Sequence, residues 1–222
     1  MLTIPFPTVL SANVENWWLD ARTRSGGETI DGREQVISSG LGRWRATVTI
    51  PLFERPRILA YRSWLIRMDG RSNLTNIGPC DCANGNVIRP LIGGIPYSPD
   101  EAFHTDGAGF SQGGNPASVT TIAAIGSTTV QIDLGGTASP PVAGSFVGLG
   151  GYLYVVTSII VLPGELATIT VLPKLRTALA VDDPVEWCHA RCPMRFLSDD
   201  TGQFELTLGR FGTATLELVE VF

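Results

Sequence analysis

The chain has 222 residues, of which 44% are hydrophobic and 17% charged, and its formal net charge is −5. Such a composition is typical of a globular protein, and the length allows one large domain or two small ones, each with its own core. No apolar run approaches the roughly twenty residues that a membrane-spanning helix needs. The acidic balance also excludes a general nucleic-acid binder, which would carry a clear basic excess. The N-terminus has neither a basic leader nor a cleavable apolar run, so we expect no signal peptide and synthesis in the cytoplasm.

The charges are unevenly distributed along the chain. Residues 1–79 carry ten arginines against seven acidic residues, whereas residues 80–187 carry three basic residues against nine acidic ones. Lys174 is the only lysine. Because arginine favours planar, bidentate ion pairs at interfaces, we expect an assembly contact in the first third of the chain. A coding bias toward arginine would explain the same excess equally well.

The pattern of residues 4–52 predicts short strands, because stretches of β-branched and aromatic residues alternate with Gly and Asn turns. These strands are expected at residues 4–10, 17–23, 33–40 and 42–52. In the last of them, every second residue is apolar and falls on one face: Trp44, Ala46, Val48 and Ile50. This strand should be half-buried in a sheet.

Residues 54–69 change to a helical period and predict the one helix of the chain. An apolar stripe recurs at three- and four-residue spacing, with two further residues that widen it: Ile58, Tyr61, Leu65 and Met68, then Leu59 and Ile66. Pro56 falls in the first turn and Gly70 follows the last periodic residue, as is usual at helix ends. Four arginines lie on the opposite, outer face: Arg55, Arg57, Arg62 and Arg67.

The middle of the chain contains a long loop followed by a second strand-rich block. Residues 78–117 are dominated by Gly, Pro, Asn, Ser and Asp, which predicts an irregular connection between units. Residues 118–187 then hold several strands of about five or six residues at close spacing, which suggests a small closed barrel or sandwich of the OB type. Two further strands are expected at the C-terminus, in residues 194–222.

The predicted fold is therefore mainly β, a tube-like β-sandwich with one helix that is interrupted by a small OB-like barrel. The first domain would comprise residues 1–116 and 188–222, and the inserted barrel residues 117–187. An insertion of this kind is common because chain ends often lie together in one domain. The competing arrangement has two domains in series, with the last strands in the second.

Two groups of segments resemble a known family. SGGETIDGREQVISSGLGRWRATVTIP, the arginine-rich helix and DGRSN are similar to the N-terminal part of tail proteins of long-tailed bacteriophages and gene-transfer particles. HTDGAGFS, AGSFVGLGGYLYVV and ATITVLPKLRTALAVDDPVEW resemble the insert of such tail-tip proteins, with Pro173-Lys174-Leu175-Arg176 at the position of a characteristic segment. The family is identified as the distal tail proteins.

This resemblance implies a structural role in the virion tail. Family members are usually hexameric rings between the tail tube and the baseplate hub, with a peripheral OB- or galectin-like domain. The expected partners are other copies of the chain, the tail tube protein, and baseplate hub and tail-tip proteins. Genome DNA would pass the lumen without specific binding, and no membrane contact is expected. The protein would be assembled in the host cytoplasm and located in the virion tail.

A ring above a dimer needs heterologous contacts, in which one face of a subunit meets a different face of the next. The candidates for the positive side of this interface are Arg43, Arg45, Arg57 and Arg62. The alternative function is a carbohydrate- or receptor-binding module of a tail tip, with residues 118–187 as the binding unit. A hydrolase is the weakest possibility, because no nucleophile–base pair can be named. We therefore expect no enzyme, no catalytic residue and no cofactor.

The cysteines raise the question of a metal site. CHARC at 188–192 places His189 before the spacer, so it does not match the Cys-x-x-Cys-His of c-type haem. Zinc or an iron–sulfur cluster would use the four thiols of Cys80, Cys82, Cys188 and Cys192. The Cys-x-Cys spacing of the first pair is, however, shorter than is usual for zinc. We expect unligated thiols, with a metal or cluster and a disulfide as open alternatives.

Polar residues in glycine-rich segments are expected to form turns rather than a site. His104 and Asp106 could be half of a metal or acid–base site, but such residues more often bond to backbone in turns. The pairs Asp182-Asp183 and Asp199-Asp200 precede Pro184 and Gly202 and are also predicted turn formers.

Overall fold

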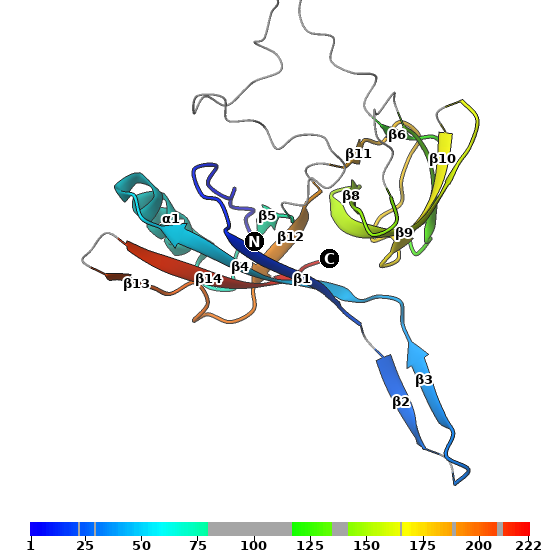
Figure 1. The fold of residues 1–222 in the computed structure, drawn as a ribbon, viewed down its shortest axis with the longest axis horizontal. Coiled ribbons are helices and arrows are strands. Elements are labelled where there is room, and N and C mark those ends of the chain that lie inside the picture. Colours follow the sequence, from blue (N-terminus) through cyan, green and yellow to red (C-terminus); the bar gives the residue numbers. More distant parts are fainter. Residues whose placement is uncertain are drawn as a thin grey trace, which may run out of the picture. The chain divides into compact units, whose positions relative to one another are not determined.

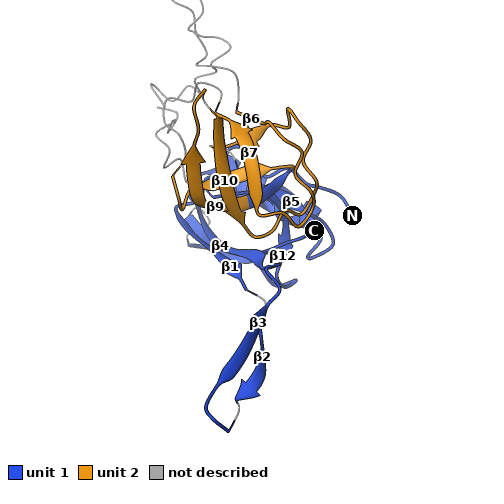
Figure 2. Cartoon of the chain, turned by 90° about the vertical axis from the view of Figure 1, so that its right-hand side faces the viewer, with its two compact units in different colours: residues 1–79, 151–153, 190–222 blue, residues 80–150, 154–189 orange. Residues whose placement is uncertain are grey.

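The structure is a computed structural model that describes residues 1–21, 23–28, 30–79, 117–134, 142–164, 166–187, 190–207 and 211–222. About half of the described residues lie in strands and these residues contain one helix, so the predicted mainly-β fold class is confirmed. The chain divides into two compact units, coloured separately in Figure 2. Among the described residues, the first unit comprises 1–79, 151–153 and 190–222, and the second 117–150 and 154–187. The remainder of the predicted loop, residues 80–116, lies outside the described residues.

The first unit is built on a six-stranded antiparallel sheet with the order β1-β4-β14-β12-β5, in which β13 also pairs with β14 (Figure 1). The central strand β14 comes from the C-terminus of the chain and pairs with β4 over eight residues. The N-terminal and C-terminal segments therefore complete one sheet. Its strands are β1 (Val14–Asp20), β4 (Arg43–Leu52), β5 (Thr75–Ile77), β12 (Cys192–Phe196), β13 (Phe204–Thr207) and β14 (Phe211–Glu220).

Strand β4 confirms the period-two pattern of the sequence. Its even-numbered residues from Trp44 to Leu52 are buried, and the odd-numbered ones from Arg43 to Pro51 are half-buried on the opposite, outer face. β14 continues this division, because Leu216 is the cross-strand partner of Val48 and both side chains are buried. Apolar alternation thus sets which face of the sheet forms the core.

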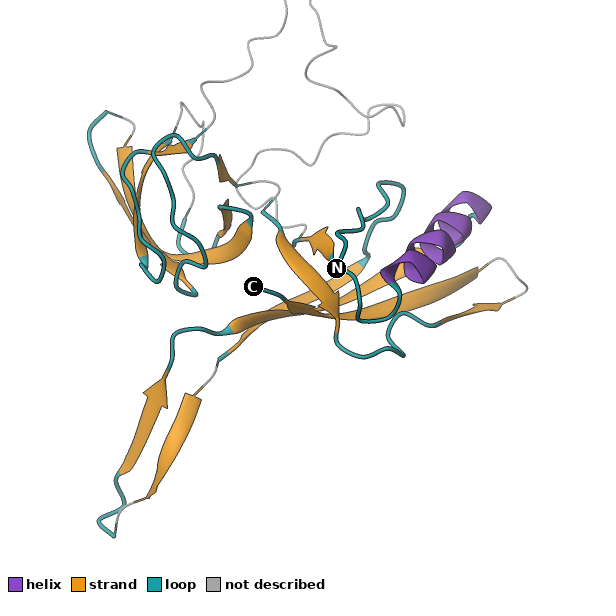
Figure 3. Ribbon diagram, turned by 180° about the vertical axis from the view of Figure 1, so that it is seen from behind, coloured by secondary structure: helices purple, strands orange, loops and turns teal. Residues whose placement is uncertain are grey.

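Helix α1 (Arg55–Met68) covers the buried face of this sheet (Figure 3). Pro56 stands in its first turn, and Asp69 ends it in the left-handed conformation with φ of 50°. The hydroxyl of Tyr61 donates a 2.6 Å hydrogen bond to the Gly202 carbonyl. A Cβ placed on Gly202 would lie 2.9 Å from that hydroxyl and 3.0 Å from Leu216, so the helix reaches the turn and the sheet at this glycine.

The apolar stripe of α1 differs in part from the predicted one. Ile58, Tyr61 and Met68 are buried as expected, but Leu59 and Ile66 are 49% and 73% exposed, so they do not widen the stripe. The buried position that the sequence pattern missed is Trp64. Its ring makes edge-to-face contacts with Phe6 and Phe196 at centroid distances of 5.2 and 5.6 Å. Aromatic partners from distant segments decide which side of the helix is buried.

The strand predicted at residues 4–10 is wrong. Only Thr3 bridges to Leu74, and the chain then turns near Thr8. Pro5 and Pro7 lack the N–H groups that a strand ladder needs. Ile4 and Leu10 are nevertheless buried, so this segment contributes to the core without extending the sheet.

Two strands leave the first unit as a separate antiparallel hairpin, β2 (Thr23–Glu28) and β3 (Glu34–Ser38), which we call the arm (residues 23–38). The arm follows β1 and returns to the start of β4 (Figure 1). All residues of both strands are exposed. In water, an isolated two-stranded hairpin is marginally stable, because it has no apolar face to bury.

The second unit is a nearly closed, barrel-shaped sheet with the order β11-β8-β9-β10-β7-β6. The two ends of this strand order approach each other: Ser118 of β6 bridges to Pro184, next to β11, and the Val119 amide donates a 2.9 Å hydrogen bond to the Asp183 carbonyl. Alternating residues of its strands are buried, as in a filled small barrel. The strands are β6 (Ser118–Val119), β7 (Thr129–Asp133), β8 (Phe146–Leu149), β9 (Tyr152–Val161), β10 (Leu166–Leu172) and β11 (Val185–Glu186).

Candidate functional site

The first pair of interface candidates lies at the start of β4, on the outer face of the sheet. Arg45 forms a 2.8 Å ion pair with Asp20 of the neighbouring strand β1, and both side chains are more than one-third exposed. The guanidinium of Arg43 lies 5.0 Å from the centroid of the Phe222 ring. Both arginines therefore have partners within the chain: Arg45 pairs with the carboxylate of Asp20, whereas Arg43 contacts an uncharged ring.

The second pair lies on helix α1. The Arg57 guanidinium stands 5.4 Å from the centroid of the Phe53 ring and is 3.9 Å from a Glu54 carboxylate oxygen. The Arg62 guanidinium stands 6.0 Å from the centroid of the Phe204 ring. Cations in this position are attracted by the ring face, and they retain N–H groups that can bind an anion.

The four arginines do not form one surface. Arg43 and Arg45 belong to the odd-numbered face of β4, whereas α1 packs on the even-numbered face through Tyr61 and Leu65. The sheet thus separates the strand pair from the helix pair. Arg57 and Arg62 contact the rings of Phe53 and Phe204, and these two rings also line a hollow in the surface.

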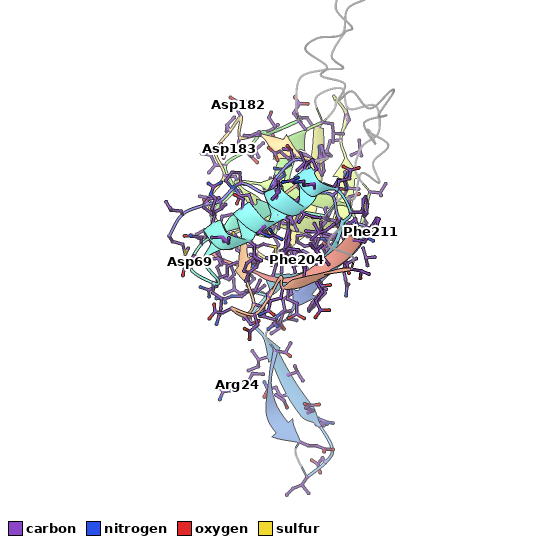
Figure 4. The ribbon with its side chains drawn as sticks, turned by 90° about the vertical axis from the view of Figure 1, so that its left-hand side faces the viewer. Arg24, Asp69, Asp182, Asp183, Phe204 and Phe211 are labelled. Carbon is purple, nitrogen blue, oxygen red and sulfur yellow. The ribbon has the colours of Figure 1, made fainter. Side chains whose placement is uncertain are left out.

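This hollow is a groove of about 740 Å³ at the C-terminal end of β4 and the beginning of β14. Three phenylalanines from different strands and their connections line it, and we call it the aromatic groove: Phe53, Phe204 and Phe211. Phe53 and Phe211 are 47% and 54% exposed, while Phe204 is held edge-to-face against Tyr61 at 5.2 Å. Figure 4 shows Phe204 and Phe211 at this side of the first unit. Exposed aromatic rings beside cations are a common feature of protein interfaces.

The arm carries apolar and acidic residues with no core behind them. Ile30 is fully exposed at its turn, and Val36 and Ile37 are 55% and 64% exposed. Glu28 and Glu34 are direct cross-strand partners, a placement in which like charges repel. Figure 4 shows the arm, with Arg24 labelled, projecting from the sheet.

The structure leaves the cysteine question open. Cys80, Cys82, Cys188 and His189 lie outside the described residues, as do His104 and Asp106. Cys192 is buried in β12, with its sulfur 3.9 Å from the Ile77 carbonyl oxygen. In the described part of the chain, no group of three or more His, Cys, Asp and Glu side chains could hold a metal ion.

Both aspartate pairs lie in turns, as predicted. Asp182 has a φ of 66°, and the Asp183 carboxylate accepts a 2.7 Å hydrogen bond from the Ala180 amide (Figure 4). Asp199 accepts a 3.1 Å hydrogen bond from the Arg71 amide, next to the turn that contains Gly202. These carboxylates stabilise local backbone.

Comparisons with known proteins give no family for this chain: no protein-family model matches it, and no match was found among the curated proteins. Within the described residues, no helix is both long and apolar enough to cross a membrane.

The arm and the aromatic groove are the features that sequence analysis missed. One signal for the arm was present, because Asp-Gly is a common dipeptide in hairpin turns; Asp31-Gly32 lies in the connection between Glu28 and Glu34, and Gly32 has a φ of 74°. The absence of alternation around it, with glycines at 26 and 27, could have indicated a hairpin without a buried face. The groove joins three phenylalanines that are far apart in sequence, so only the fold reveals it.

Proposed function

We propose that this protein is a structural component of a virion tail, a ring that joins the tail tube to the baseplate hub and leaves a lumen for DNA. The observation that carries the assembly role is the arm. All residues of its two strands are exposed, and a hairpin of this kind becomes stable when another surface covers it.

Two further features support assembly into an oligomer over a monomeric state. Strand β1 pairs with β4 alone among the described strands, so it stands at an edge of the sheet, and edge strands favour contact with another chain. Phe53 and Phe211 expose aromatic surface on the same unit. The placement in a tail, and hexameric symmetry, come from the family resemblance of the sequence.

Passage of DNA requires a lumen that does not retain phosphates. Residues 1–79 and 190–222 of the first unit carry 13 arginines against 12 acidic residues, and Arg45 is paired with Asp20, which fits a wall that is close to neutral. A basic lumen would bind the DNA backbone and slow its transit.

The alternative, a carbohydrate-binding module, receives less support from the second unit. The large apolar side chains that it exposes are aliphatic, such as Ile122, Ile125 and Val181, among the described residues. Sugar-binding surfaces usually present aromatic rings instead.

Negative-stain electron microscopy of the purified chain tests the proposal. We expect rings of uniform diameter with a central opening. Dispersed single particles, together with saturable binding to a glycan array, would contradict the ring and favour the binding module.

A further inference from the structure

The side of helix α1 that faces away from the sheet carries charge of one sign. The helix contains four arginines and no acidic residue. Residues three or four apart lie on the same face of a helix. One row of this spacing is exposed, and we call it the helix stripe: Arg55, Leu59, Arg62 and Ile66. Over about 16 Å the helix stripe therefore alternates between a cation and an aliphatic side chain.

The two faces of the arm differ in charge. Cross-strand partners share a face of a hairpin, and so do residues two apart in one strand. Glu28 is the partner of Glu34, and Val36 follows two residues later, so one face presents two carboxylates beside an exposed valine. We call this the acidic face of the arm. On the opposite face, Arg24 is the partner of Ile37.

The acidic face and the helix stripe match in charge and in spacing. Glu34 and Val36 lie about 6.6 Å apart along their strand. Arg62 and Ile66 lie about 6 Å apart along the helix axis. A guanidinium placed against the two glutamates relieves the repulsion between these like charges. Val36 and Ile66 are 55% and 73% exposed, so their contact removes apolar surface of both copies from water.

The two aspartate pairs of the turns suit the helix stripe less well than the arm does. Asp183 accepts a hydrogen bond from the Ala180 amide, and Asp199 accepts one from the Arg71 amide. These carboxylates already stabilise local backbone, whereas the glutamates of the arm are placed as a pair of like charges. The arm is therefore the acidic segment that gains most from a cationic partner.

We infer that the arm of one copy lays its acidic face on the helix stripe of the next copy, with Glu34 against Arg62 and Val36 against Ile66. Strand β4 separates the base of the arm from the start of α1, because its ten residues span about 33 Å, whereas the paired part of the arm spans about 20 Å. The contact thus fits between copies. This inference rests on the proposed ring and specifies its contact. Because the contact joins different surfaces of two subunits, it repeats head to tail, as closure of a ring requires.

Site-specific photo-crosslinking tests the contact in the full-length chain. Val36 is replaced by p-benzoylphenylalanine, isotope-labelled and unlabelled chains are mixed, and the irradiated oligomer is mapped by mass spectrometry. We expect crosslinks between labelled and unlabelled copies to the tryptic peptides 58–62 and 63–67 of the helix. The same substitution at Ile37 is the control, because this neighbour is similarly exposed but lies on the opposite face of the arm, and it should not crosslink to them.

Charge exchange provides a second readout. Glu28→Lys with Glu34→Lys, and Arg55→Glu with Arg62→Glu, should each weaken self-association by about tenfold or more. Mixing the two variants should restore it, because each arm then meets a helix of opposite charge. Arg24→Glu, on the other face of the arm, is the control and should leave self-association within about twofold of wild type.

The outcomes distinguish the inference from the proposed function. An oligomer in which the Val36 crosslinks lie within one chain or reach other peptides would overturn the contact between arm and helix and leave the ring intact. Two charge variants that do not rescue each other would do the same. A wild-type chain without any oligomer would instead reject the ring itself.

Discussion

The two units satisfy their backbone hydrogen bonds in different ways. The second unit closes its sheet on itself, since β6 pairs with β7 on one side and bonds to Asp182 and Asp183 on the other. The first unit has an open edge at β1 and extends an arm whose residues are all exposed. Closure removes the need for a partner, whereas an open edge and a hairpin without a core favour one. The difference indicates that the first unit is the assembling part of the chain.

Among the changes considered, deletion of the arm should have the largest effect on self-association of the chain. When a short Gly/Ser linker replaces residues 23–38, we expect self-association to be lost, because no residue of the arm contributes to a core. The far-ultraviolet circular dichroism and the unfolding transition should stay close to wild type. Sedimentation velocity measures the assembly. An arm-less chain that still forms the wild-type oligomer would show that other surfaces hold the ring.

Deletion of the barrel, by contrast, should leave self-association intact. Replacing residues 115–189 with a Gly/Ser linker should leave a folded, oligomeric remainder, because the sheet of the first unit contains both ends of the chain. Sedimentation and thermal unfolding measure the result. If the remainder is insoluble or loses its cooperative transition, the two-domains-in-series arrangement is favoured over the insertion.

Trp64→Ala tests whether the helix and sheet form one core. Its ring packs against Phe6 and Phe196 and is 2% exposed, so the substitution should lower the unfolding free energy by about 3–5 kcal/mol. Ile66→Ala, on the exposed side of the same helix, is the control and should cost about 0.5 kcal/mol or less. Urea denaturation measures both. Equal effects would mean that the helix does not bury the face described above.

The barrel offers a smaller, local test. Asp183→Ala removes the carboxylate that accepts a hydrogen bond from the Ala180 amide beside the closing strands, and should cost about 1 kcal/mol. Asp182→Asn removes the same charge but keeps a residue that tolerates a positive φ, so it should be nearly neutral. Thermal unfolding compares the two variants. A larger loss of stability for Asp182→Asn than for Asp183→Ala would contradict the stabilising role assigned to the Asp183 carboxylate.

A pH dependence is expected from Tyr61. Burial raises the pKa of this phenol well above its ordinary value near 10. Below about pH 10 the phenol is protonated in both folded and unfolded chains, so its contribution to stability is fully present there. Above that pH the unfolded chain ionises first, and the contribution is lost as pH rises further.

Tyr61→Phe isolates this effect. The variant should lose about 1 kcal/mol at neutral pH, because the hydrogen bond to Gly202 is removed. The stability difference between wild type and variant should shrink above pH 10. Urea melts from pH 8 to 11 provide the comparison, and a constant difference across this range would contradict the assigned burial.

The sequence predicts best where local patterning and packing agree. Every second residue of β4 is apolar, and the structure buries these residues because the neighbouring strand β14 presents the same alternation and α1 covers that face. The helix is found to within one residue at either end, since Pro56 and Gly70 mark its limits. Trp64 was missed because its burial depends on Phe6 and Phe196, which no helical period reveals.

The candidate site was predictable only in part. The arginine excess indicated a charged surface, but the sequence could not show that a sheet separates Arg43 and Arg45 from Arg57 and Arg62. Residues 17–23 and 33–40 were predicted as short strands, without an assignment to a sheet. The chain leaves the main sheet after Asp20 and forms the arm, because residues 23–28 contain two glycines and no apolar residue to bury.

Native mass spectrometry of the wild-type chain tests the central claim most directly. The account predicts one dominant species of six times the 23.8 kDa chain mass at micromolar concentration. It should dissociate to single chains at high salt, because screening weakens the contacts between arginines and carboxylates. Monomers at every concentration and ionic strength would contradict the claim that the first unit assembles into a ring.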